Sequence, residues 1–415
     1  MVFRGVHLEG PRGRSEQVAG RFAPWTGGSS RPWEEPPGAT GRIWLTNRVN
    51  YFDLQGIELS AVDSALERFV REQQSCPSGA GVHGRSLWEE VLEHTRSGKR
   101  LRSRLVMLAA CSNGPHDHEA AAAVAAAYGL LHAAFILHDD VIDRDDMRYG
   151  RPSLHAAHAA GAASRGMSDD LATHRGYTRS ILAGDLALAA AYRLLLAGTA
   201  DVPAPAREEL QRILHDTVVT TTLGELLDVE LSFSPDQATT GEDAGDPREK
   251  ALRTAELKTA VYTFCAPLQS GALLAGLGAD QVAAVGRAGT HLGMAFQLED
   301  DLLGVFGDPG AIGKPVGGDL REGKHTYLMA TALASEAASE VKDLLSRACA
   351  ADDDELSRIN LAMRELLTRC GALQATADQI RDHARQARDE IAGAALPAPL
   401  GDALAALAEE IGSAR

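Results

Sequence analysis

The sequence has few aromatic residues, few cysteines and a deficit of positive charge. Phe, Trp and Tyr make up only 5% of the 415 residues, whereas the strands of sandwiches and barrels are enriched in aromatic and β-branched side chains. Alanine, a strong helix former, is abundant and favours helix over sheet. Lys and Arg number 41 against 57 Asp and Glu, which gives a formal net charge of −16. This surplus of carboxylates disfavours binding to nucleic acid or to an anionic membrane surface.

Other absences bear on location. The 5 cysteines are widely spaced, without a CxxC pair or a histidine at zinc-ligand spacing, which favours a reducing compartment. No uninterrupted apolar run reaches the length of about 18 residues that a transmembrane helix needs. Residues 1–30 lack the apolar centre of a secretory signal. The sequence therefore predicts a cytoplasmic protein without stable membrane insertion.

Residues 1–50 differ in composition from the rest of the chain. They are rich in Gly, Pro, Arg and Ser and show no apolar periodicity, which predicts a flexible N-terminal extension; a start codon placed too early is the alternative. Beyond them, long segments repeat apolar residues at i, i+3, i+4 and i+7, the period of helices. Polar, glycine-containing segments at 161–178 and 232–246 predict loops. Residues 51–415 are therefore expected to form one all-α domain, a large helical bundle around a central cavity.

A cluster of carboxylates follows a very apolar segment in HDDVIDRDD, which begins at His138. Asp139 and Asp143 are four residues apart and share a helix face, with Asp140 beside them. Like charges at this spacing destabilise a helix unless a cation lies between them, and Mg²⁺ prefers oxygen ligands. For this cluster alone, a solvated acidic helix end is the alternative explanation.

A second cluster, Glu299, Asp300 and Asp301, ends another apolar segment far along the chain. If the two clusters face each other, they form a site in which magnesium ions are shared with substrate phosphates. Taken singly, a basic residue is more often a solvated surface cation, but several lie near the acidic clusters. Lysine and arginine at this density suit a diphosphate.

The order and spacing of these segments resemble the all-trans polyprenyl diphosphate synthases, and most of all the bacterial geranylgeranyl diphosphate synthases. The matching segments run from about Ser97 to Thr326 and include GKRLRSRL, LLHAAFILHDDVID, MRYGRPS, GELLD, LKTAVYT, FQLEDDLLGVFGD and GKPVGGDLREGK. The resemblance implies the type I isoprenoid synthase fold and a homodimer. It also implies a prenyltransferase of isoprenoid biosynthesis that condenses isopentenyl diphosphate with an allylic diphosphate.

The resemblance further implies metal ligands. Asp139, Asp140 and Asp143 match the first aspartate-rich motif of the family, and Asp300 and Asp301 match the second. Together these motifs bind three Mg²⁺ ions that bridge to the allylic diphosphate. We expect direct ligation by Asp139, Asp143 and Asp300.

Other positions match residues that contact the substrates in the family. Those that match contacts to the allylic diphosphate are Arg148, Lys258 and Lys314. Thr259 and Gln297 match the lining of the reacting end. The positions that match the isopentenyl diphosphate site are Lys99, Arg102 and His132. The catalytic set implied by the resemblance is Asp139, Asp140, Asp143, Arg148, Lys258, Asp300 and Asp301.

Three departures from the family pattern concern the site. Tyr149 stands where the family usually has a second arginine, which implies weaker binding of isopentenyl diphosphate or a changed acceptor. Gly304 replaces the fifth-position aspartate of the second motif, for which Asp308 is a candidate substitute. Glu225 replaces the usual glutamine that precedes Asp228 in GELLD.

Product length depends on the helix that carries the first motif. Ala134 and Phe135 lie five and four residues before Asp139, and in the family bulk at these positions stops elongation. A small residue beside a large one predicts a product of intermediate length, geranylgeranyl diphosphate with twenty carbons, with fifteen or twenty-five as alternatives. An ordinary core role for Phe135 is equally compatible with the sequence.

Other functions on the same fold stay open at this point. One is a class I terpene synthase or an unusual prenyltransferase, although cyclases normally carry an Asn/Ser/Glu motif where this chain has LEDDLLG. Another is a non-catalytic subunit of a heteromeric synthase, although such subunits usually lose one aspartate cluster. Because both clusters are present here, the sequence favours the catalytic prenyltransferase.

Overall fold

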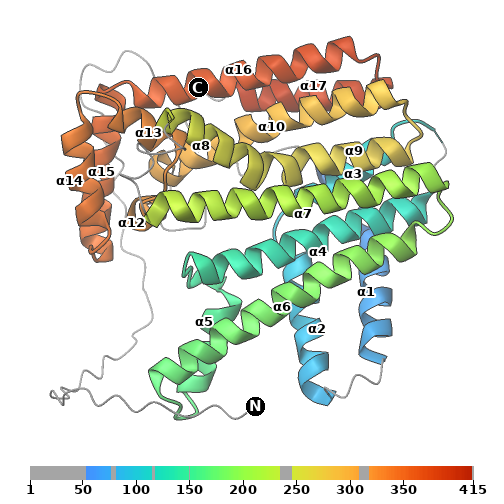
Figure 1. The fold of residues 1–415 in the computed structure, drawn as a ribbon, viewed down its shortest axis with the longest axis horizontal. Helices are drawn as coiled ribbons and strands as arrows, with labels where there is room; N and C mark the ends of the chain where they lie inside the picture. Colours follow the sequence, from blue (N-terminus) through green and yellow to red (C-terminus); the bar gives the residue numbers. More distant parts are fainter. Residues whose placement is uncertain are drawn as a thin grey trace. The chain divides into compact units, whose positions relative to one another are not determined.

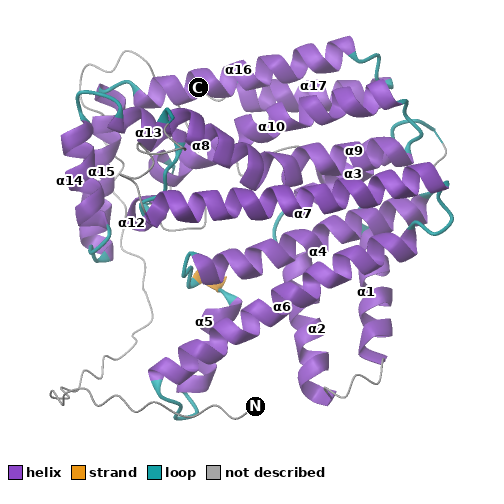
Figure 2. Ribbon diagram, in the orientation of Figure 1, coloured by secondary structure: helices purple, strands orange, loops and turns teal. Residues whose placement is uncertain are grey.

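The structure of the chain is a computed structural model. It describes residues 53–75, 81–114, 117–148, 150–233, 245–307 and 317–413. Within these residues the chain is almost wholly helical (Figures 1 and 2), which confirms the predicted all-α class. The predicted extension over residues 1–50 lies outside the described residues, as do Cys76, Tyr149, Asp308 and Lys314.

The helices follow one another with short connections. Those of the first half are η1 (Asp53–Gly56), α1 (Ser60–Ser75), α2 (Gly81–Arg96), α3 (Leu101–Ala110), α4 (His118–Ile142), α5 (Leu154–Ala163), α6 (Asp169–Gly198) and α7 (Ala204–Phe233). Those of the second half are α8 (Pro247–Ala255), η3 (Glu256–Cys265), α9 (Ala266–Leu274), α10 (Ala279–Phe306), α12 (Gly318–Glu322), α13 (Tyr327–Leu333), α14 (Ala338–Ala348), α15 (Asp353–Arg369), α16 (Ala372–Gly393) and α17 (Ala398–Gly412).

Helix α4 is the core helix of the first half. Asp117 caps it by accepting hydrogen bonds from the backbone amides of Glu119 and Ala120. Its alanines allow neighbouring helices to approach closely, because a Cβ on Gly198 of α6 would overlap the Cβ of Ala123. By length and composition α4 and α6 resemble membrane spans, but 83% of the apolar window of α4 is buried inside the protein. This burial brings the carboxylates at its C-terminal end to the edge of the core.

Helix η3 is a π-helix between α7 and α10, a winding that the sequence pattern did not predict. Glycines on both neighbours leave room for it. A Cβ on Gly224 of α7 would lie 2.7 Å from the carbonyl carbon of Leu257, and a Cβ on Gly293 of α10 would lie 2.6 Å from Cα of Ala260. Single π-turns occur frequently at functional sites, and this one carries Lys258.

The predicted loop over residues 161–178 is wrong for most of its length. Helix α5 continues to Ala163, and α6 begins at Asp169. Asp169 and Asp170 stand in the first turn of α6, where negative side chains favour the helix dipole. The polar residues of this segment form the solvent face of a helix. Of the other predicted loop, 232–246, residues 234–244 lie outside the described residues.

A two-residue ribbon follows α4. Strand β1 (Met147–Arg148) pairs antiparallel with β2 (Arg151–Pro152), and Arg148 stands opposite Arg151. Gly150 has a φ of 73°, a left-handed conformation that glycine adopts without strain. The ribbon turns the chain back beneath the end of α4 and so positions Arg148.

Candidate active site

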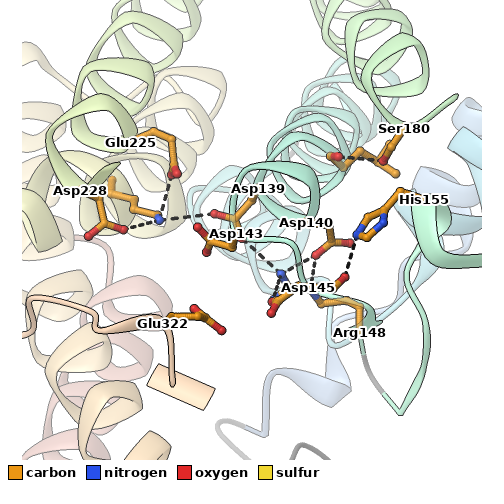
Figure 3. A network of polar contacts seen from close by, with 12 residues as sticks. Asp139, Asp140, Asp143, Asp145, Arg148, His155, Ser180, Glu225, Asp228 and Glu322 are labelled. Atoms are coloured by element: carbon orange, nitrogen blue, oxygen red, sulfur yellow. Dashed lines mark hydrogen bonds and ion pairs between the residues drawn. The ribbon is translucent and has the colours of Figure 1, made fainter. Parts of the chain in front are cut away.

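Three carboxylates from two helices converge at the end of α4 (Figure 3). Asp139 and Asp143 lie one turn apart, and Glu225 faces them from α7. One oxygen of each lies within 4.8 Å of the others, which is a spacing that a single metal ion can bridge. The predicted pairing of Asp139 with Asp143 on one helix face is therefore present in the structure.

Lys258 of η3 joins these carboxylates to a further one. Its Nζ lies 2.6 Å from Asp228 Oδ2, 2.9 Å from Glu225 Oε2 and 3.4 Å from Asp139 Oδ1. Burial alone would lower the pKa of Lys258, but the surrounding carboxylates, above all Asp139, raise it above its ordinary value. Glu225 shows the opposite balance, because burial raises its pKa to about 7 in spite of Lys258.

A second lysine, Lys324, lies on the other side of Asp143. Its Nζ is 3.2 Å from Asp143 Oδ2, 2.9 Å from Glu322 Oε2 and 3.9 Å from Asp319 Oδ1. Burial raises the pKa of Glu322 to about 7. In this protein two ammonium groups therefore hold carboxylates that would otherwise repel one another.

Asp140 has a different environment from its neighbour Asp139. Its side chain is buried and accepts a hydrogen bond of 2.7 Å from Arg148 Nε. Arg148 Nη2 also lies 3.2 Å from Asp139 Oδ2 and 2.9 Å from Asp145 Oδ2 (Figure 3). Asp140 and Asp145 thus orient the guanidinium, and Asp140 contacts Arg148 rather than the convergent carboxylates.

The second acidic cluster lies at the end of α10. Asp300 is exposed, whereas Asp301 is buried and accepts a hydrogen bond of 2.7 Å from Gln297 Nε2. Burial and the nearby Asp319 raise the pKa of Asp301 well above its ordinary value. A Cβ on Gly304 would overlap Asp319 Oδ2, so the Asp319 carboxylate occupies the space of the missing side chain. Asp319 links the second cluster to Lys324 and hence to the first.

The predicted isopentenyl diphosphate residues lie along a separate wall. Arg102 donates a hydrogen bond of 2.7 Å to Thr263 Oγ1, and its guanidinium carbon lies 4.1 Å from the centre of the Tyr262 ring. The His132 ring centre is 6.1 Å from that of Tyr262. Burial, together with the positive charge of Arg102, lowers the pKa of His132 well below its ordinary value. The neutral imidazole therefore serves as a polar contact without charge.

Residues near the ends of this wall complete the predicted set. Lys99 is exposed in the turn before α3 and interacts electrostatically with Asp300. Thr259 is half-buried on η3 beside Lys258. Ala134 is buried, and the ring of Phe135 packs edge-on against Tyr262 with centroids 5.2 Å apart.

Sequence reasoning missed several residues that contact the predicted ones. Asp319, Glu322 and Tyr262 were not assigned a role, although the first two lie in the GGDLREGK segment beside Lys324. Asp228 and Glu225 were noted only as parts of a motif. Their spacing at i, i+3 on a helix was the available signal, because such residues share a face.

The fold and the site together define a class of enzyme. Lysines and an arginine set among carboxylates at one end of an all-α bundle suit a metal-bound diphosphate, and the apolar wall beside them suits a hydrocarbon. Residues 85–366 match the family model described as Polyprenyl synthetase, and the chain belongs to this family. It is accordingly a transferase of isoprenoid biosynthesis, a prenyltransferase.

Relatives with different products resemble the chain to a similar degree. It is 36% identical over 265 residues to the geranylgeranyl diphosphate synthase of Mycobacterium tuberculosis, which covers 63% of this chain and 67% of the relative. It is 31% identical over 296 residues to the geranylfarnesyl diphosphate synthase of Aeropyrum pernix, which covers 70% and 82%. The solved geranylgeranyl pyrophosphate synthase of Corynebacterium glutamicum, complexed with isoprenyl diphosphate and magnesium, superposes with a TM-score of 0.76 at 29% identity, covering 88% of this chain and 100% of that one.

Proposed function

We propose that the chain condenses isopentenyl diphosphate with an allylic diphosphate to give geranylgeranyl diphosphate, and that it needs Mg²⁺ to do so. The observation that carries the proposal is the convergence of Asp139, Asp143 and Glu225 beside Lys258. The apolar wall at Phe135 begins one helical turn below Asp139 on α4. A charged end and a hydrocarbon channel then lie in the order that a prenyl diphosphate requires.

The residues present fit magnesium. Their donors are carboxylate oxygens, the ligands that Mg²⁺ prefers together with substrate phosphates. Glu225 Oε1 is buried without a hydrogen-bond partner among the described residues, so the site holds an acceptor that a cation would satisfy. Asp139 and Asp143 would hold the metal on one side, and Asp300, exposed at the end of α10, would complete it from the other. We infer three ions per site from the family resemblance.

The bound metal supplies Lewis-acid stabilisation of the departing diphosphate. The residues of the chain itself position the reactants. Arg148, held by Asp140, and Lys258 would contact the allylic diphosphate and stabilise the charge that develops as the carbon–oxygen bond breaks. Lys314 is proposed for the same role from the sequence alone. Arg102, Lys99 and the neutral His132 would hold isopentenyl diphosphate.

Chain length is proposed to depend on the floor formed by Ala134 and Phe135. Tyr262 braces the Phe135 ring from η3, and the guanidinium of Arg102 lies over the same tyrosine. The floor is thus fixed by contacts between α4, η3 and α3. A fixed floor one turn below Asp139 supports a short product, for which we propose twenty carbons.

A second copy of the chain is the proposed partner. Helices α6 and α7 are in contact, and each exposes apolar residues along one stripe. These residues are Leu182, Ala189 and Leu196 on α6, and Val219, Leu223 and Leu226 on α7. A continuous exposed apolar surface marks an interaction site. Leu182→Glu combined with Leu223→Glu should convert a dimer to a monomer in light scattering, and an unchanged mass would contradict this surface.

A cytosolic location is proposed from the cysteines. Those within the described residues, Cys111, Cys265, Cys349 and Cys370, are free thiols. This is the state expected in a reducing compartment.

The test of the activity is direct incubation. Purified protein with Mg²⁺, isopentenyl diphosphate and dimethylallyl, geranyl or farnesyl diphosphate in turn should yield linear diphosphates, with the twenty-carbon product predominating. Hydrocarbons formed without isopentenyl diphosphate would instead indicate a terpene synthase, and no product in any mixture would indicate a non-catalytic subunit. Asp139→Ala should abolish turnover while circular dichroism shows unchanged helicity.

A further inference from the structure

Glu225 is the residue in the site that departs from the family pattern by gaining a charge. It lies on α7, directly after Gly224, and faces Asp139 and Asp143 across the interface with α4 (Figure 3). Where the family usually has an amide, this chain has a third carboxylate within 4.8 Å of the other two. An amide offers one neutral oxygen, whereas a carboxylate offers two oxygens and a negative charge.

The two oxygens of Glu225 have different surroundings. Oε2 lies 2.9 Å from Lys258 Nζ, and that ammonium is also bound by Asp228 at 2.6 Å. Oε1 is buried and has no hydrogen-bond partner among the described residues. A buried carboxylate oxygen without a partner is costly, and a cation between Glu225 and the α4 carboxylates would remove this cost.

The charges around Lys258 favour a further cation. Asp139, Asp143, Glu225 and Asp228 supply four negative charges when ionised, and Lys258 supplies one positive charge. The difference, 4 − 1, leaves three negative charges, compared with two if residue 225 were an amide. Affinity for hard divalent cations rises with the number of charged ligands.

We propose that Glu225 is a direct ligand of the magnesium ion bound by Asp139 and Asp143, and that it allows this ion to bind before any diphosphate arrives. The inference rests on the magnesium site of the proposed function. Magnesium sites with few protein carboxylates depend on substrate phosphates to complete the coordination. Three carboxylates from α4 and α7 reduce that dependence. Ligation by Glu225 would also release Lys258 from it, which leaves the ammonium available to the diphosphate.

Binding of Mn²⁺ to the substrate-free protein, followed by electron paramagnetic resonance, tests this without any turnover. Mn²⁺ is a hard divalent ion that takes the same oxygen ligands as Mg²⁺. Glu225→Gln, which restores the usual family residue with nearly the same shape, should weaken binding about tenfold or more. Glu225→Asp, which keeps the charge but withdraws it by one methylene, should give an intermediate affinity. Addition of a non-reactive allylic diphosphate analogue should narrow the difference between wild type and Glu225→Gln.

Two further variants separate this inference from the proposed function. Glu230→Gln makes the same change at an exposed position of the same helix and should leave Mn²⁺ affinity unchanged. Asp139→Asn should weaken binding strongly. If Asp139→Asn weakens binding and both Glu225 variants do not, Glu225 is no ligand and the inference is overturned while the magnesium site stands. If Asp139→Asn has no effect, the magnesium site itself is misplaced and the inference fails with it.

Discussion

The close contact between α7 and η3 at Gly224 makes the position of Lys258 depend on a missing side chain. An alanine Cβ at this position would lie 2.7 Å from the carbonyl carbon of Leu257 and closer still to the backbone nitrogen of Lys258. Ordinary van der Waals contact begins at 3.4 Å, so Gly224→Ala forces the backbones apart by at least 3.4 − 2.7 = 0.7 Å. Both obstructing atoms belong to the backbone, and no change of rotamer relieves them.

We expect Gly224→Ala to reduce turnover far more than stability. Alanine gains about 1 kcal/mol of helix propensity over glycine, and overpacking costs about 1–3 kcal/mol. The free energy of unfolding should therefore fall by about 0–2 kcal/mol. Lys258 moves with η3, and a displacement near 1 Å in a reacting site costs about 10²-fold in rate.

The assay is steady-state kinetics with isopentenyl diphosphate and an allylic diphosphate, beside urea denaturation of the same preparation. Gly401→Ala is the matched control, because α17 is also helical there and the nearest atom to the added Cβ would be Leu396 Cβ at 3.8 Å. The control should keep full turnover and gain up to about 1 kcal/mol of stability. Wild-type turnover in folded Gly224→Ala would refute the link between this contact and Lys258.

Three other substitutions probe the floor, the arginine and a histidine pair. Phe135→Ala should shift the products toward longer chains on chromatography, because it removes the ring at the proposed floor; an unchanged distribution would mean that Phe135 does not stop elongation. Arg148→Lys should lower the free energy of unfolding in urea by about 3 kcal/mol, because lysine cannot reproduce the forked contacts and leaves buried Asp140 poorly paired; equal stability would show that the pair contributes little. Burial and His291, whose Nδ1 is 3.1 Å away, lower the pKa of His383 to about 4. The unfolded chain binds this proton near pH 6.5, so stability is lost as the pH falls from about 6.5 toward 4. His383→Asn should lose less melting temperature than the wild type over this range, and an equal loss in both proteins would contradict that assignment.

The sequence pattern predicted the helices of the core well because burial leaves a periodic trace. In α4 the apolar run, the capping Asp117 and the terminal carboxylates are all local features. The segment 161–178 shows where this reasoning fails. A polar stretch has the same composition whether it is a loop or the exposed face of a long helix, and only the packing of α6 against α4 and α5 decides between them.

The site was predictable where one helix carries the information and not where two helices meet. The spacing of Asp139 and Asp143 places them on one face, but adjacent Asp140 takes its role from Arg148, which the β1–β2 ribbon returns to it. Glu225 meets Lys258 because Gly224 admits the π-helix. Neither the ribbon nor the π-turn has a periodic pattern in the sequence, since each depends on contacts between segments far apart in the chain.

The formal charge of −16 is consistent with a diphosphate site because the local balance differs from the total. At the end of α4 the carboxylates outnumber the two lysines, and each lysine contacts at least two carboxylates. A free diphosphate would therefore meet a negative field here, and the ammonium groups could not turn to it without leaving their partners. Divalent cations change both conditions at once, since they invert the local sign and compete for the carboxylates that hold Lys258 and Lys324. Metal binding, lysine release and diphosphate binding are thus expected to be coupled, so a metal-free preparation should bind a diphosphate analogue weakly even though every cationic residue is present.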